Sequence, residues 1–145
     1  MEERAFDPLR LDAQICFPLY AASREVIKRY TPFLDAIGLT YTQYVTMLVL
    51  WEHKQIGAGE LGRLLHLDSG TLTPVLKALE GKGYVKRTRS HRDERVLLVE
   101  LTECGESLRI EAEQIPLRVG ACIPLPQEDA MQLHRILHEL LDRMT

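Results

Sequence analysis

Several features that would assign a protein to a special class are scarce in this 145-residue chain. Its three cysteines are widely spaced and form no CxxC pair, which excludes zinc-finger and thioredoxin-type arrangements. Nine glycines and seven prolines are too few for a low-complexity chain. No apolar run approaches the ~18 residues that a membrane-spanning helix needs. The sequence therefore predicts neither a disulfide scaffold, a membrane protein nor a disordered repeat.

The composition that is present fits one ordinary globular domain. Hydrophobic residues make up 46% and charged residues 27% of the chain, close to the globular average. The N-terminal MEERAFDPLR has mixed charge and no apolar segment, so we expect no secretory signal and a cytoplasmic, reducing location. In that location an unpaired cysteine is either inert or chemically active.

The net charge of −3 conceals one basic segment. Residues 69–95 carry seven basic and three acidic side chains, so this segment is +4 and the rest of the chain is −7. A local basic segment in a weakly acidic protein indicates contact with a polyanion, although charge alone leaves a solvated loop equally open. The basic residues are Lys77, Lys82, Lys86, Arg87, Arg89, Arg92 and Arg95.

The spacing of apolar residues predicts helices in the first part of the chain. The first runs from Leu9 or Leu11 to about Leu34, and Pro18 inside it indicates a kink or a helix start nearby. Thr40 and Gln43 form a capping box for the second. The helix that begins at Ser69 stops at Gly81 and Gly83, because glycine favours helix C-termini. Helices are thus predicted over 9–34, 41–53, 60–66 and 69–81, with a turn at 54–59.

The pattern changes after Gly83. YVKRTRS and VLLVEL are rich in β-branched residues and flank the charged HRDER, which predicts a β-hairpin with a basic tip. Thr102 caps a helix that ends before Pro116. Residues 117–126 are expected to be irregular because of their prolines and glycine, and a last helix is predicted over 127–144.

This order of elements is typical of a winged helix-turn-helix. The fold class is therefore mainly α with a small β-hairpin wing. The second helix of the pair would enter the major groove of DNA, and the hairpin would reach the backbone or the minor groove. A winged-helix module used for protein contacts remains the alternative.

Three strings carry a resemblance to a known family: ICFPLYA, LTYTQY and LDSGTLTP. With their surroundings (12–52, 67–90 and 92–105) they cover most of the chain, which resembles the MarR family of winged-helix repressors and, within it, the organic hydroperoxide sensors of the OhrR type. The resemblance implies an intertwined helical homodimer that binds palindromic double-stranded operator DNA when reduced and is released by organic hydroperoxides. It implies about 1–38 and 103–145 as dimerisation region and about 39–102 as DNA-binding lobe.

The dimer has support from the residues themselves. The last helix has a wide apolar face that one small lobe cannot bury, formed by Leu133, Leu137, Leu140 and Leu141. No cofactor, metal or catalytic residue is expected.

The resemblance assigns the sensing thiol to Cys16. A sensor thiol must be partly ionised and reachable, and tyrosine hydroxyls stabilise a thiolate without adding charge. The sequence offers Tyr20, Tyr30 and Tyr41, and the resemblance points to Tyr30 and Tyr41. Without the resemblance, Cys16 would be interpreted as a small core residue.

A second cysteine would decide the chemistry after the first oxidation, because a sulfenic acid condenses with a nearby thiol. Cys122 occurs where some members of this branch carry such a cysteine, so the resemblance makes it the resolving thiol of the partner subunit. Cys104 has no role in the family pattern and is interpreted as a bystander.

The DNA contacts also transfer by motif. Short hydroxyls suit phosphate oxygens and base edges, and lysine suits phosphate. In the wing, Arg95 would probe the minor groove and Asp93 would hold it, although a solvated salt bridge is the alternative. Ala78 departs from the family, where a second basic residue is frequent. The predicted DNA-binding residues are Ser69, Thr71, Thr73, Lys77, Asp93 and Arg95.

Three other functions compete with this hypothesis. His134 and His138 have a metal-binding spacing, but Arg135 stands where a zinc protease needs glutamate, which favours a solvated or interface face. A thiol peroxidase would use Cys16 as nucleophile and would leave the basic wing unexplained. A MarR-type repressor that responds to a small phenolic ligand would make Cys16 incidental.

Overall fold

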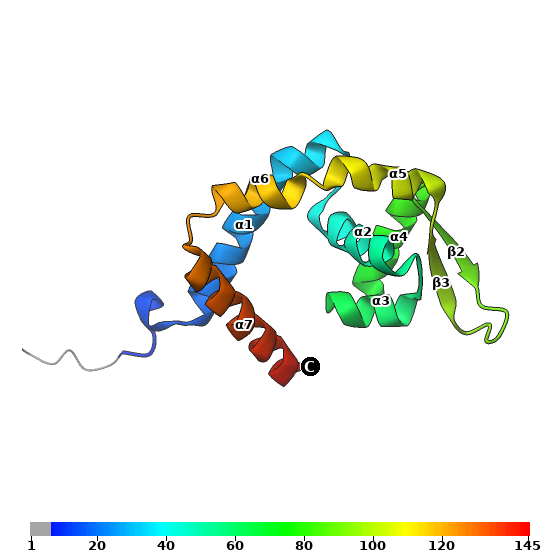
Figure 1. The fold of residues 1–145 in the computed structure, drawn as a ribbon. Helices are drawn as coiled ribbons and strands as arrows, with labels where there is room; N and C mark the ends of the chain where they lie inside the picture. Colours follow the sequence, from blue (N-terminus) through cyan, green and yellow to red (C-terminus); the bar gives the residue numbers. More distant parts are fainter. Residues whose placement is uncertain (1–6) are drawn as a thin grey trace, which may run out of the picture.

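The computed structural model describes residues 7–145, and residues 1–6, on which the expected absence of a secretory signal partly rests, lie outside the described residues. The chain is mainly helical with one small antiparallel sheet (Figure 1). Its elements are η1 (Leu11–Ala13), α1 (Cys16–Ala36), α2 (Tyr41–His53), β1 (Gln55–Gly57), α3 (Ala58–Leu65), α4 (Ser69–Gly81), β2 (Val85–Arg89), β3 (Leu97–Leu101), α5 (Glu103–Ala112), α6 (Ile115–Cys122) and α7 (Gln127–Met144).

Helix α1 begins at Cys16, later than the predicted start at Leu9 or Leu11. Pro18 is therefore its third residue. The backbone amides of the first helical turn have no partner within the helix, so a proline there removes no hydrogen bond. Of the two alternatives that Pro18 left open, the helix start is correct. The 3-10 turn η1 precedes it.

Helix α2 begins where its predicted capping box lies. The hydroxyl of Thr40 accepts a hydrogen bond from the Gln43 amide at 3.3 Å, and the Gln43 side chain accepts one from the Thr40 amide at 3.1 Å. The predicted turn at 54–59 is wrong, because 55–57 form strand β1, paired with β3. A three-residue strand has no sequence pattern of its own and exists because β3 supplies its hydrogen-bond partners.

Helices α3 and α4 form the helix-turn-helix. Gly62 allows the turn between them, since a Cβ there would lie 2.8 Å from the Leu67 carbonyl oxygen. Asp68 caps α4 by accepting the Thr71 amide at 2.7 Å, and this hydrogen bond lowers the pKa of the Asp68 carboxyl. Gly83, with φ +79°, ends α4 in a left-handed conformation that glycine adopts without strain.

The wing is the hairpin β2–β3, with strand order β1-β3-β2 in the sheet. Arg87 pairs with Val99 in the middle of the hairpin, and the Ser90 amide donates to the Val96 carbonyl at its tip. Thr102 caps α5 as predicted, by accepting the Gly105 amide at 3.1 Å.

The prediction of an irregular segment over 117–126 is wrong for its first part, which belongs to α6. Pro116 lies in the first turn of α6, where proline is tolerated. Ile115 and Val119 are buried, and α6 packs against α1. Tertiary contact on one face thus offsets the low helix propensity of this stretch. Helix α7 covers the predicted range.

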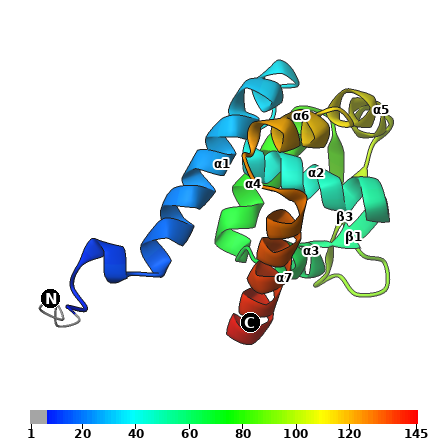
Figure 2. The ribbon, with the colours of Figure 1, turned by 60° about the vertical axis from the view of Figure 1, so that its left-hand side comes forward.

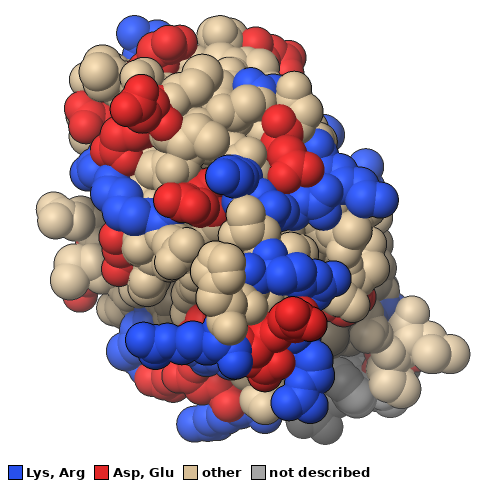
Figure 3. Space-filling view, turned by 90° about the vertical axis from the view of Figure 1, so that its right-hand side faces the viewer, with Lys and Arg blue, Asp and Glu red and all other residues tan. Residues whose placement is uncertain are grey.

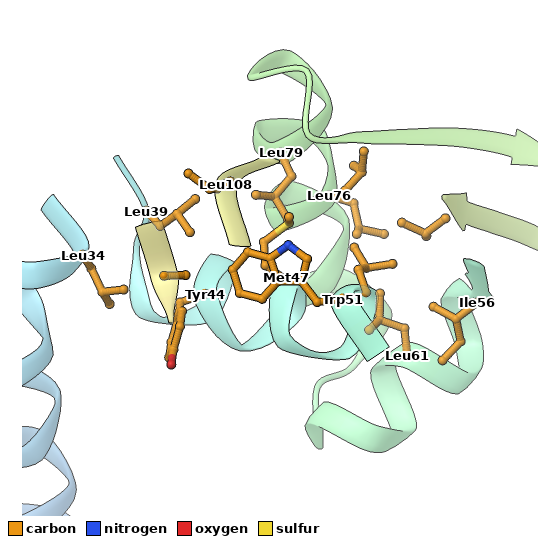
Figure 4. Packing of buried hydrophobic residues seen from close by; sticks show 14 of the residues in the cluster. Leu34, Leu39, Tyr44, Met47, Trp51, Ile56, Leu61, Leu76, Leu79 and Leu108 are labelled. Atoms are coloured by element: carbon orange, nitrogen blue, oxygen red, sulfur yellow. The ribbon is translucent and has the colours of Figure 1, made fainter. Parts of the chain in front are cut away.

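The hydrophobic core lies between α2, α3, α4 and the sheet, and reaches α5 (Figure 4). Met47, Leu61 and Leu79 are completely buried within it. The two terminal helices contribute almost nothing to this core: α7 has no buried residue, and α1 buries only Leu34. Figure 1 shows α7, and Figure 2 the first half of α1, standing apart from the winged lobe, residues 39–102.

No single helix within residues 7–145 is long and apolar enough to cross a membrane. Helices α1 and α2 pass that test only as a pair bent by 73°, by length and composition alone, and core helices pass the same test.

Candidate nucleic-acid interface and thiol site

Helix α4 presents all four of its predicted DNA-binding side chains to solvent. Its inner face buries Leu72, Leu76 and Leu79. The Thr73 hydroxyl donates to the Ser69 carbonyl at 2.7 Å, so its lone pairs remain free to accept a hydrogen bond. The exposed residues on the outer face are Ser69, Thr71, Thr73 and Lys77.

Pro74 is the sixth residue of α4, one turn beyond the orphan amides where a missing donor costs least. The carbonyl of Gly70 therefore has no amide donor four residues on. Gly70 is exposed, so water can satisfy this carbonyl.

The wing residues Asp93 and Arg95 lie in contact. One carboxylate oxygen of Asp93 accepts the Arg95 backbone amide at 3.0 Å and the Arg95 Nε at 3.2 Å. The Arg95 side chain is nevertheless 91% exposed. Asp93 thus holds the base of an arginine that projects from the hairpin tip, which is the geometry a groove-probing side chain requires.

The basic segment divides into two groups. Four of its side chains are exposed and form no ion pair or side-chain hydrogen bond with residues 7–145: Lys77, Lys86, Arg89 and Arg92. Lys82, Arg87 and Arg95 instead make side-chain contacts within the chain. Figure 3 shows basic side chains in several groups on the face at the wing end, with acidic side chains between them. The number of basic side chains that are free to contact a polyanion is therefore smaller than the seven that residues 69–95 contain.

Glu80 and Arg87 fix the recognition helix to the wing. The Glu80 carboxylate accepts the Arg87 backbone amide at 3.1 Å and its Nη2 at 3.0 Å. These hydrogen bonds hold the pKa of Glu80 below its usual value. Because Arg87 lies in β2 and Glu80 in α4, the two elements that carry the candidate DNA contacts keep one mutual orientation. Sequence reasoning counted Arg87 only as part of the basic segment.

Tyr30 and Tyr41 are brought together, with ring centroids 5.1 Å apart in an edge-to-face arrangement. Tyr44, which the sequence did not single out, joins them at 5.7 Å from Tyr30 and 6.3 Å from Tyr41. Its place one turn after Tyr41 is the signal that could have found it. Burial raises the pKa of all three phenols, that of Tyr44 to about 12, so these hydroxyls stay protonated hydrogen-bond donors.

Cys16 is the first residue of α1 and is exposed, so the interpretation as a core residue is wrong for the single chain. Tyr30 lies on the same helix, 14 residues later. At 1.5 Å per residue this is ~21 Å, so the two residues do not meet within one chain. Tyr20 lies one turn after Cys16, and its hydroxyl accepts a hydrogen bond from Arg24 at 3.2 Å, which leaves its own O–H free to donate.

The other two cysteines are also exposed. Cys122 is the last residue of α6, the helix that packs against α1. Cys104 is the second residue of α5, at the base of the wing. Cys122 and Cys104 thus lie on different helices: Cys122 ends the helix that packs against α1, and Cys104 follows the second strand of the wing.

Two features bear on the competing functions. His134 and His138 of α7 have their Nε2 atoms 3.0 Å apart, but residues 7–145 contain no group of three or more His, Cys, Asp or Glu that could hold a metal ion. A cavity of about 290 Å³ lies between α2 and α5, lined by Tyr44, Trp51 and Arg109 among others. The phenolic-ligand hypothesis requires a pocket between the dimerisation helices and the winged lobe, and this cavity is lined by residues of both.

Comparisons with known proteins agree with this geometry. A family model described as the transcriptional regulator SarA/Rot matches residues 28–111. The organic hydroperoxide resistance transcriptional regulator of Bacillus subtilis is 44% identical over 142 residues, which cover 98% of this chain and 97% of that protein.

Solved structures are similar over nearly the whole chain. Reduced AbfR bound to DNA is 36% identical with a TM-score of 0.76, covering 94% of this chain and 95% of that one. The disulfide form of AbfR, a protein of Staphylococcus epidermidis, has a TM-score of 0.65 at 37% identity, covering 92% and 93%. A mutant MarR of Escherichia coli in complex with operator DNA shares the fold, at 23% identity and a TM-score of 0.78 over 88% and 93%.

Proposed function

Because this chain belongs to the MarR family of winged-helix transcriptional regulators, in its organic hydroperoxide branch, we propose that it is a homodimeric repressor released from operator DNA when Cys16 is oxidised. The observation that carries the proposal is the exposed thiol of Cys16 at the start of α1, on the region that one chain leaves uncovered. The relatives are regulators, and we propose no enzymatic turnover.

The uncovered region requires a second copy of the chain. Helix α7 has 18 residues and buries none of them, although isolated helices of this length are only marginally stable in water. Burying its apolar face against a partner supplies the missing stabilisation. Exposed apolar side chains lie at the start of α1 and along α7: Ile15, Phe17, Leu19, Met131, Leu133, Ile136, Leu140 and Met144. The dimerisation region is thus about 1–38 and 103–145.

The tyrosines then act across the dimer. The hydroxyls of Tyr30 and Tyr41 lie far from Cys16 of their own chain, so the thiolate of Cys16 accepts its hydrogen bonds from Tyr30 of the partner subunit and Tyr41 of the partner subunit. Neutral phenols donate to a thiolate and favour it over the thiol. Their raised pKa values keep these donors protonated.

The redox step uses the peroxide as oxidant. The Cys16 thiolate attacks one peroxide oxygen, the O–O bond breaks, and the alkoxide leaves as an alcohol after taking a proton. Cys16 becomes a sulfenic acid. The thiol of Cys122 of the partner subunit then attacks this sulfur, which forms a disulfide and releases water. Disulfide formation requires the two Cα atoms within ~7 Å, so α1 and the partner's α6 must shift if the reduced dimer holds the two cysteines farther apart.

The reduced dimer binds DNA through two winged lobes. Ser69, Thr71, Thr73 and Lys77 contact the major groove and its phosphates, and Arg95, held by Asp93, enters the minor groove. Half-sites about one helical turn apart, ~34 Å, match a two-fold axis. A change in the spacing of the two lobes therefore releases the operator.

The test begins with a duplex selected from a random-sequence pool by the reduced dimer. Fluorescence anisotropy of this duplex should fall when cumene hydroperoxide is added to the bound wild type. The Cys16→Ser variant should bind the duplex and remain bound after the same treatment. Release of Cys16→Ser by peroxide would exclude thiol sensing.

The cavity beside Arg109 supports a second candidate, a repressor released by a small phenolic acid. In that case salicylate would release the wild type and Cys16→Ser alike, and peroxide would release neither.

A further inference from the structure

Lys82 links the recognition helix to the segment between α1 and α2. It is the C-cap residue of α4, and its ammonium group donates to the carbonyl of Gly38 and, at 2.9 Å, to Oε1 of Gln43. Gly38 ends α1, and Gln43 lies in the first turn of α2. Among the residues that the structure describes, no other side-chain hydrogen bond joins α4 to these two helices.

The position of the ammonium group has a clear physical cause. The amides of Gly38 and Leu39 bond back to Asp35 and Leu34, so the last turn of α1 closes and directs carbonyl oxygens toward its C-terminal end. That end carries partial negative charge, which a cation stabilises. Gly38 follows this end of the helix with φ +70°, and its carbonyl oxygen accepts a hydrogen bond from the Lys82 ammonium group.

The second acceptor is part of a cap. The same Oε1 of Gln43 accepts the Thr40 amide at 3.1 Å, and the Gln43 side chain is only 8% exposed. Tyr41 lies between these two capping residues and packs against Tyr30. Lys82 is therefore hydrogen-bonded to the turn of backbone that holds Tyr41 in place.

We propose that Lys82 is a positioning residue that couples the tyrosine cluster to the recognition helix. This inference rests on the proposed function, because it requires that Tyr30 and Tyr41 rearrange when Cys16 is oxidised. A shift of Tyr41 moves the first turn of α2, and with it the Gln43 oxygen. Lys82 carries that movement to the C-terminal end of α4, and so to the spacing of the two recognition helices. Lys82 belongs to the basic segment but is not a phosphate contact.

The experiment compares two lysines with methionine replacements, which keep the aliphatic stem and remove the ammonium group. Lys82→Met should weaken DNA binding by the reduced dimer and leave binding by the peroxide-treated dimer unchanged. The ratio of the two affinities should fall about tenfold, within the ~2- to 30-fold range for residues in a coupling network. The slope of log affinity against log salt should stay at the wild-type value.

Lys77→Met is the matched control, because Lys77 is exposed on the outer face of α4. It should weaken both redox states alike and reduce the salt slope by about 2 per dimer, one lost phosphate contact per subunit. If Lys82→Met behaves as Lys77→Met does, or changes no affinity, the assignment of Lys82 is overturned.

A double-mutant cycle makes the test independent of any single variant. Gln43→Met should lower the same ratio, and Lys82→Met should lower it no further when Gln43 is already replaced. Independent, additive effects would overturn the proposal. Wild-type protein on the same duplex distinguishes a failure of the proposed function from a failure of the Lys82 proposal. If peroxide does not release the wild type, the proposed function is refuted. If the wild type is released normally and Lys82→Met has the same ratio of affinities, only the role of Lys82 is refuted.

Discussion

Arg87 of strand β2 donates its backbone amide and its guanidinium group to the carboxylate of Glu80 on α4, at 3.1 and 3.0 Å. The Arg87 side chain is 20% exposed and that of Glu80 is 39% exposed. This ion pair, closed by a backbone hydrogen bond, is a fixed joint between the two elements proposed to read DNA. It also makes the stability of the lobe depend on pH in a defined direction.

Glu80→Gln should lower the melting temperature at neutral pH and have no effect in strong acid. The folded-state pKa of Glu80 is depressed by Arg87, so the stabilisation is fully present above the unfolded-state pKa near 4.5. It is lost as the pH falls through the lower folded-state value. Thermal melting at a series of pH values checks this. Glu94→Gln is the control, since Glu94 pairs with no described residue. If Glu80→Gln lowered the melting temperature equally at every pH, the ion pair between Glu80 and Arg87 would not be the source of the stability.

The tyrosine cluster should appear in an alkaline titration. Tyr30, Tyr41 and Tyr44 all have raised pKa values through burial, and Tyr44 reaches about 12. Ultraviolet absorbance of phenolate should show a component that titrates near that pH. Tyr44→Phe should remove this component. Ionisation of Tyr30, Tyr41 and Tyr44 at an ordinary pKa, ~10, would mean that the cluster is not packed as described.

The apolar face of α7 should hold the dimer together. A double replacement, Leu137→Asp with Leu140→Asp, places two charges where a partner helix would pack. Sedimentation at micromolar concentration should show a wild-type dimer and a variant monomer, since desolvating two carboxylates costs several kcal/mol, or roughly a thousandfold in the dimerisation constant. Gln132→Asp, at an exposed polar position outside this row of leucines, should leave the dimer intact. A wild-type monomer under these conditions would refute the assembly.

Arg95→Ala should weaken binding of the selected duplex by about 1–3 kcal/mol, the range for one good groove contact. Asp93→Ala should weaken it less, because the arginine remains but is no longer held at its base. Arg135→Ala is the matched control, since Arg135 lies on α7 and pairs with Glu139. Affinity for DNA that is unchanged in Arg95→Ala would show that the wing does not enter the groove.

A non-reducing gel tests the resolving thiol. Mild cumene hydroperoxide should convert the wild type into a covalent dimer, and both Cys16→Ser and Cys122→Ser should abolish it. Cys104→Ser should leave the covalent dimer unchanged, because Cys104 lies at the base of the wing. If the band persists in Cys122→Ser but is lost in Cys104→Ser, then Cys104 is the resolving thiol.

Local chemistry explains the features that could be predicted from the residues alone. The caps of Thr40, Asp68 and Thr102 depend on a side chain and an amide three residues later, so a short string of sequence specifies each of them. Gly83 ends α4 for a similarly local reason. The order of these elements could therefore be predicted from the sequence. That order in turn predicted the winged helix-turn-helix, which positions the candidate DNA contacts.

Other features depend on partners distant in the chain. Residues 55–57 become a strand because β3 pairs with them, and α6 forms because Ile115 and Val119 pack into an apolar surface. The family resemblance pointed to Cys16, Tyr30 and Tyr41 but could not show that one chain keeps Cys16 and Tyr30 ~21 Å apart along α1. Nor could it separate Lys82 and Arg87 from the other basic residues. Only folding brings Gly38, Gln43 and Glu80 within hydrogen-bond distance of those two cations, and hydrogen bonds act over ångströms in space rather than positions in a chain.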